Sequence, residues 1–121
     1  MTKDPRLPLL HILEAIGWIE EEVLDVNYTA FASDRRGRLS IERCVEIISE
    51  ASRRIPDELR SNHPDIEWPA MAAVGNILRH DYHTVDPNIL WDIVTDDLPP
   101  LKETVEAMLQ DINRSKRPVQ N

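Results

Sequence analysis

The sequence NILRHDYH, residues 76–83, places polar side chains in a segment that otherwise has the apolar pattern of a helix. At about 100° per residue, Asn76, His80 and His83 fall on one face of that helix, with Arg79 at its edge. Apolar residues of the same predicted helix fall on the opposite face: Met71, Val74 and Leu78. The stretch therefore predicts a packed helix that exposes one polar face.

Helical patterns of apolar residues continue on both sides of this segment. Toward the N-terminus, they extend over about 5–26 and 35–54, and Asp34 is suited to cap the second of these helices. Toward the C-terminus, Asp86-Pro87 is typical of a helix start, with Asp as the cap and Pro at the first helical position. The apolar face of this last helix continues beyond Pro99-Pro100, which should kink or split the helix.

Two shorter segments complete the predicted fold. Residues 29–33 could form a single turn whose Phe31 plugs the core, and residues 56–60 have the pattern of a short helix that follows a proline. No segment has the pattern of a credible β-strand. The sequence therefore predicts an all-α protein, an antiparallel helical bundle of four to five main helices with short helical turns between them.

Length and composition bound the domain organisation. A chain of 121 residues has the size of one domain, and we expect residues 1–113 to form it, with residues 114–121 as a basic, flexible tail. No apolar run is long enough to cross a bilayer, and the N-terminus lacks the pattern of a secretory signal. The single Cys44 excludes an internal disulfide and suits a reducing cytosol. We therefore expect a cytoplasmic protein that makes no membrane contact.

The formal net charge of −8 hides an uneven distribution of arginine. Half of the 14 cationic residues lie between positions 35 and 60, and all of these are arginines: Arg35, Arg36, Arg38, Arg43, Arg53, Arg54 and Arg60. A guanidinium group binds phosphate in a fork, so this strip could contact RNA or a nucleotide. The candidates for such contacts are Arg35, Arg36, Arg53 and Arg54. The alternative is that the arginines pair with glutamates along a solvated helix.

His80 is the strongest candidate for proton transfer, because an imidazole titrates near neutral pH. Arg79 could stabilise negative charge on a phosphate oxygen, and Asn76 could orient the imidazole or bind phosphate. A base, an acid and a cation are the minimum that a metal-free ribonuclease needs. The alternative is that His80 is a surface or interface residue without a chemical role.

The same segment admits two further roles. His80 and His83 could share a metal ion, with Asp81 or Asp86 as a third ligand. Two histidines without further spaced ligands are poor evidence for such a site, and we expect neither a metal nor a cofactor. The hydroxyl of Tyr82 could accept a nucleotidyl group, which would add charge and bulk beside His80 and switch the site off. Alternatively, Tyr82 is a core tyrosine.

Several sequence segments form a pattern that covers nearly the whole chain. They are, in order, LHILEAI (10–16), FASDRR (31–36), EIISEASRRIP (46–56), HPDIEW (63–68), the spaced residues Asn76, His80, Asp81 and Tyr82, then VD (85–86), LWDIV (90–94) and DLPPL (97–101). Together they resemble the HepT-like proteins of the HEPN superfamily, the toxin half of toxin–antitoxin pairs whose partner is a minimal nucleotidyltransferase.

The resemblance implies an all-helical homodimer in which the two histidine-bearing helices lie near the shared interface. It also implies a metal-independent, RNA-cleaving activity that inhibits growth. The partner enzyme would neutralise this activity, and in such pairs it can transfer AMP to the tyrosine of the motif, here Tyr82.

This sequence departs from the family's pattern at one position. The usual motif has an arginine, four to six intervening residues, and then the histidine, one residue and a tyrosine. Gly75 stands where the arginine before Asn76 would be. The nearest arginine is Arg79, and Gly75 would instead allow close approach of helices at the interface. Our first hypothesis is a ribonuclease toxin that acts through His80. A second is a noncatalytic binding module that serves a nucleotidyltransferase as substrate or scaffold, and a third is a helical dimerisation domain that has lost its chemistry.

Overall fold

The computed structural model describes residues 4–80 and 85–116, with only the backbone described for residues 79, 80 and 116. The described residues contain helices and no strands, which confirms the predicted all-α class. The elements are α1 (Arg6–Val23), α2 (Tyr28–Ser33), α3 (Arg35–Ser52), α4 (Asp57–Ser61), α5 (Trp68–His80), α6 (Pro87–Asp92), the π-helical turn η1 (Ile93–Asp97) and α7 (Leu98–Lys116).

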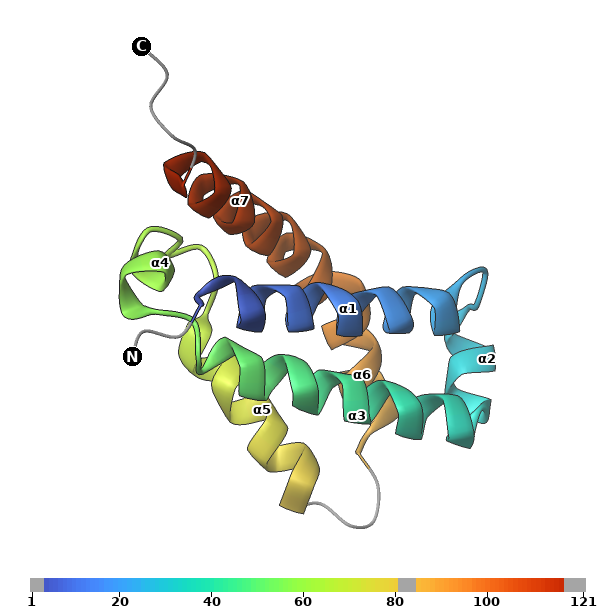
Figure 1. The fold of residues 1–121 in the computed structure, drawn as a ribbon. Helices are drawn as coiled ribbons and strands as arrows, with labels where there is room; N and C mark the ends of the chain where they lie inside the picture. The colour runs from blue at the N-terminus through green and yellow to red at the C-terminus, as the bar shows by residue number, and fades with distance from the viewer. Residues whose placement is uncertain (1–3, 81–84, 117–121) are drawn as a thin grey trace.

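The helices form a bundle around the antiparallel pair α1 and α3, which the short α2 connects at one end (Figure 1). The helix α5 packs against α3, and α7 packs against α1. The short α4 lies in the connection between α3 and α5, so α5 begins beside the C-terminal end of α3 (Figure 1). This order places α5, the helix that contains Asn76, on the outer side of α3.

The apolar stripes that the sequence shows are buried where the helices meet. Ile12 of α1, Val45 and Ile48 of α3, and Val105 of α7 have no exposed side-chain surface. Such burial stabilises the fold because it removes apolar surface from water. Helix propensity alone would not hold helices of this length in place.

Phe31 fills the core as the sequence predicts. It is buried in α2, and its ring centroid lies 4.8 Å from that of Trp91 in α6. Tyr28 approaches Trp91 edge-on at 5.9 Å. Aromatic pairs at these separations contribute beyond the apolar area that they bury.

Two of the predicted helix starts are confirmed by their capping bonds. The carboxylate of Asp34 accepts a hydrogen bond from the backbone N–H of Gly37 at 3.0 Å. The carboxylate of Asp86 accepts one from the N–H of Asn88 at 2.9 Å, with Pro87 at the first helical position. Each cap satisfies a backbone donor that the first helical turn leaves free.

The two prolines of the last helix split it into α6 and α7 through the wider turn η1. Pro99 and Pro100 have no N–H groups to bond to the carbonyls four residues earlier, and their rings would clash with those carbonyls. The turn that precedes them adopts the π form, which accommodates this local strain. The α7 helix then runs to Lys116, so the first residues of the predicted tail are helical. The division into a domain and a tail stays a prediction.

None of the helices in the described ranges is long and apolar enough to span a membrane.

Candidate functional site

The helix that carries the candidate site is attached to α3 at Gly75. A Cβ atom at this position would lie 2.5 Å from Oγ and 2.7 Å from Cβ of Ser49. Real side chains do not pack at these distances, so only glycine permits the two helices to come so close. The close approach predicted for Gly75 therefore occurs within the chain, against α3.

A buried hydroxyl group occupies the point of contact. Ser49, which is 2% exposed, accepts a hydrogen bond from the N–H of Gly75 at 3.1 Å. Its hydroxyl also donates to the backbone carbonyl of Ala72 at 2.9 Å. Directional bonds of this kind fix how α5 is positioned along α3, because each has a restricted length and angle.

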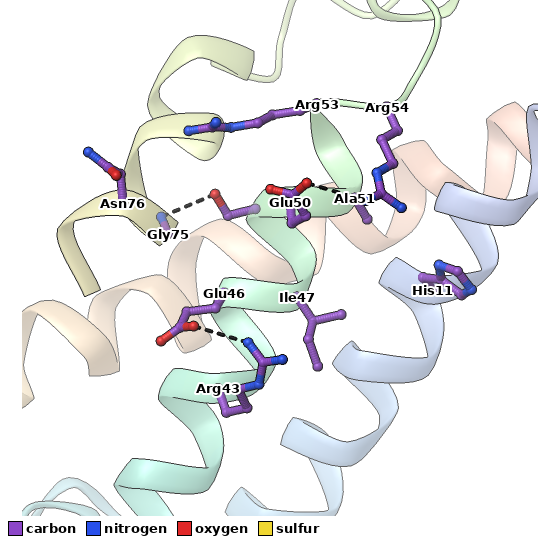
Figure 2. A pocket seen from close by; sticks show the side chains of 11 residues that line it. His11, Arg43, Glu46, Ile47, Glu50, Ala51, Arg53, Arg54, Gly75 and Asn76 are labelled. Atoms are coloured by element: carbon purple, nitrogen blue, oxygen red, sulfur yellow. Dashed lines mark hydrogen bonds and ion pairs between the residues drawn. The ribbon is translucent and has the colours of Figure 1, made fainter. Parts of the chain in front are cut away.

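A second side chain, that of Arg53, also bonds across the same contact. Its Nη2 donates to the carbonyl oxygen of Ala72 at 2.8 Å, although the residue is exposed. The guanidinium group therefore lies over α5, whereas Arg54 extends toward α1 (Figure 2).

A cavity of about 220 Å³ opens beside this contact, with residues from α1, α3 and α5 in its wall. Its cationic residues are Arg43, Arg53 and Arg54, with His11 of α1 on the opposite side (Figure 2). Glu46 and Glu50 lie in the same wall. Three guanidinium groups and two carboxylates leave a formal charge of +1 with His11 neutral, in a chain whose total is −8. The cavity is therefore suited to an anionic group.

The structure brings some predicted site residues together and leaves others undescribed. Asn76 is exposed and lines the cavity with Arg53 and Arg54. Arg79 and His80 are the last two residues of α5, and their side chains lie outside the described part. Asn76 and His80 are one turn apart on the helix, about 6 Å along its axis. Tyr82 lies outside the described residues, as do Asp81 and His83 of the metal hypothesis.

The other predicted phosphate contacts lie far from this cavity. Arg35 and Arg36 are exposed at the first turn of α3, and Arg53 and Arg54 follow its last turn. At 1.5 Å per residue, the two pairs are about 27 Å apart. They cannot hold the same phosphate group, but a nucleic-acid strand could contact both.

The alternative interpretation, pairing with glutamates, holds for two of the arginines. Arg43 pairs with Glu46 at 3.1 Å and Arg54 with Glu50 at 3.4 Å. Arg60 pairs instead with an aspartate, Asp57 of α4. Exposed pairs of this kind contribute little to stability. Arg53 differs from them, because its described bond is to a neutral carbonyl group and leaves the positive charge uncompensated by that partner.

Two titratable groups elsewhere in the fold have shifted pKa values. Burial raises the pKa of the Cys44 thiol, which favours its uncharged, less reactive form. Burial also raises the pKa of Asp97 in η1, and the nearby charges of Asp96, Asp92 and Glu67 add to the effect. No cluster of three metal-ligating side chains occurs among the residues whose side chains the structure describes, 4–78 and 85–115.

Sequence reasoning missed two residues of this region. Ser49 falls within the buried side of α3, where a hydroxyl among apolar positions is a signal for a hydrogen-bonded contact. His11 is exposed on α1, and only the packing of α1 beside α3 shows that it faces the cavity.

Comparisons with known proteins agree with the features described above. The family model described as "Ribonuclease HepT-like" matches residues 12–108. A protein of Methanocaldococcus jannaschii named "Putative RNase MJ1380" is 36% identical over 106 residues, which are 88% of this chain and 97% of that protein. "Probable ribonuclease HepT" of Thermococcus cleftensis is 38% identical over 97 residues, or 80% and 88% of the two chains. No solved structure shows significant similarity. The family match and these identities establish that the chain belongs to the ribonuclease HepT-like family.

Proposed function

We propose that the protein is a metal-independent endoribonuclease whose reactive residues are His80, Arg79 and Asn76. The observation that carries the proposal is the position of Asn76. It lines a cavity rich in arginine, one helical turn before His80. A phosphate group of RNA in this cavity would lie beside the polar face of α5. The names of the relatives support the same reaction class.

The proposed reaction includes two proton transfers, one from the attacking 2′-hydroxyl and one to the leaving 5′ oxygen. His80 accepts the proton of a ribose 2′-hydroxyl, whose oxygen attacks the adjacent phosphorus while the bond to the 5′ oxygen breaks. That leaving oxygen takes a proton from His80 of a second copy of the chain. The products are a 2′,3′-cyclic phosphate and a 5′-hydroxyl. Arg79 stabilises the charge that develops on the phosphorane, and Asn76 orients the imidazole or binds a phosphate oxygen.

RNA would extend beyond the reacting nucleotide along α3. Arg53 and Arg54 contact it at the cavity, and Arg35 and Arg36 contact it at the other end of the helix. Contacts of arginine with phosphate are independent of base sequence and weaken as salt concentration rises.

The activity would belong to a cytoplasmic toxin–antitoxin pair. In this proposal, the protein is a homodimer and a minimal nucleotidyltransferase is its antitoxin. Transfer of AMP to Tyr82 silences the toxin, because it adds a phosphate charge and an adenosine two residues from His80. The family membership supports this pairing.

RNA cleavage by the purified protein in EDTA tests the enzyme function. We expect cyclic phosphate ends from the wild type and no cleavage by the His80→Ala variant. Arg60→Ala serves as the control, because Arg60 pairs with Asp57 outside the cavity. Equal cleavage by wild type and His80→Ala would refute the role of His80.

The buried position of Gly75 favours one alternative function. Ser49 fills the space into which a side chain from position 75 would extend, so α5 has no motif arginine there and no room for one without repacking. In this alternative, the protein is a noncatalytic substrate or scaffold of the nucleotidyltransferase. Incubation with that enzyme and ATP would then add one AMP to the intact mass while RNA remains uncut. An unchanged mass would count against both the alternative and the proposed silencing at Tyr82.

A further inference from the structure

We propose that Arg53, the residue that follows α3, supplies a second guanidinium group, in addition to that of Arg79, which binds the scissile phosphate beside α5. The inference rests on the ribonuclease function proposed above and assigns one of its contacts to the reacting centre. It starts from a chemical requirement. The phosphorane formed during RNA cleavage carries two negative charges on its nonbridging oxygens, and a nearby cation lowers the energy of that state. Position 75 of α5 has no side chain to provide one.

The bond from Arg53 to Ala72 places the guanidinium at a defined height on α5. In an α-helix, the carbonyl of residue 72 lies at the level of the N–H of residue 76. Ala72, Asn76 and His80 are spaced by four residues, so they follow one stripe of the helix surface. The guanidinium of Arg53 therefore lies at the first turn of the stripe that contains Asn76 and ends at His80. Figure 2 shows Arg53 extending over α5 on the side of Asn76.

The same bond leaves the group able to bind an anion. A guanidinium has five N–H donors, and the described bond to Ala72 uses Nη2 alone. A carbonyl partner restricts the orientation of the group without neutralising its charge. Arg43 and Arg54, the other arginines of the cavity, are held by glutamates. Arg53 is exposed, so a phosphate can reach its remaining donors without displacing a carboxylate.

The glycine contact makes this arrangement geometrically consistent. Because Gly75 and Ser49 close the gap between the helices, the side chain that follows α3 by one residue can reach the backbone of α5. Arg53 thus contacts α5 from the end of a neighbouring helix. Its position depends on how α5 packs against α3 rather than on the sequence of residues 76–83.

The test is steady-state cleavage of one RNA oligonucleotide in EDTA at fixed salt by wild type, Arg53→Ala, Arg53→Lys and Ser49→Ala. We expect Arg53→Ala to lose about 10²-fold in kcat with a smaller change in KM, as for removal of one group that stabilises transition-state charge. Arg53→Lys should recover part of the loss, because it restores the charge without the fork. Millimolar guanidinium should partly rescue Arg53→Ala but not His80→Ala.

Ser49→Ala is the matched structural control. Its hydroxyl bonds to the same carbonyl of Ala72 as Arg53 does, but it carries no charge. If Arg53 acted only by holding α5 in place, Ser49→Ala would reproduce the loss in kcat, and the inference would be overturned. Cleavage by Arg53→Ala at the wild-type rate would also overturn it while leaving the ribonuclease proposal intact. A wild-type protein that left RNA uncut would defeat the ribonuclease proposal and this inference together.

Discussion

Two of the contacts of α3, with α1 and with α5, hold the fold in different ways. Its contact with α1 is made by buried apolar side chains, which can adjust to one another without a fixed partner. Its contact with α5 adds to the apolar packing a glycine, a buried hydroxyl and a guanidinium that bonds to backbone. The comparison indicates that apolar packing supplies stability, whereas the polar contact fixes the position of the helix that carries the candidate site.

The largest effect is expected from a cavity in the apolar contact. Ile48 of α3 has no exposed surface, so Ile48→Ala should lower the free energy of unfolding by about 2–5 kcal/mol. Urea denaturation followed by circular dichroism measures the change. Leu39→Ala is the control, because Leu39 is on the same helix but 54% exposed and should change stability by less than about 0.5 kcal/mol. Similar losses in the free energy of unfolding for the two variants would contradict the conclusion that buried apolar packing supplies the stability.

A smaller loss is expected at the polar contact. Gly75→Ala adds a methyl group that meets Ser49 at 2.5 Å, so the helices must shift, at a cost of about 1–3 kcal/mol. Gly17→Ala is the matched control in α1, where an added Cβ meets nothing within 4 Å and helix propensity should raise stability by about 0.5–1 kcal/mol. Shifts of opposite sign in the denaturation midpoints of the two variants, relative to wild type, would support the close approach of α3 and α5. A stabilised Gly75→Ala protein would refute it.

The smallest effect is expected at η1, away from both contacts. The pKa of Asp97 is raised above 3.8, chiefly by burial. The folded state therefore binds this proton more tightly than the unfolded state, and stability falls as pH rises from about 3.8 through the folded pKa. Asp97→Asn removes this penalty, so its melting temperature should exceed that of wild type at pH 7.

The advantage of Asp97→Asn should disappear as pH approaches 3.8, which thermal melts at pH 4 and pH 7 would reveal. Asp65→Asn, at an exposed position of the loop before α5, provides the comparison and should give the same difference from wild type at both pH values. A pH-independent gain for Asp97→Asn would indicate that its charge is not the cause.

Much of the fold was predictable because its signals are local. The caps at Asp34 and Asp86 and the apolar stripe of α3 each depend on residues within a few positions of one another. The form of the break at Pro99-Pro100 was not predictable, since a kink and a widened turn can both accommodate two residues without N–H groups.

The candidate site was less predictable because its residues come from three helices. The spacing of Asn76 and His80 is visible in the sequence, but the position of Arg53 over Ala72 depends on the crossing of α3 and α5. The sequence also suggested that the arginines form one strip, whereas the length of α3 separates Arg35 and Arg36 from Arg53 and Arg54. The side chain of His80 and the whole of Tyr82 lie outside the described residues, so their roles stay predictions.

The three tryptophans make these regions separately observable by fluorescence. Trp18 is 46% exposed on α1, Trp91 of α6 packs against the rings of Tyr28 and Phe31 in α2, and Trp68 is buried at the start of α5 with its indole N–H bonded to the carbonyl of His63. Their emission maxima should therefore differ, with Trp18 furthest to the red. A chain that retains only Trp68 would report the release of α5 during unfolding, and one that retains only Trp91 would report when the core itself opens.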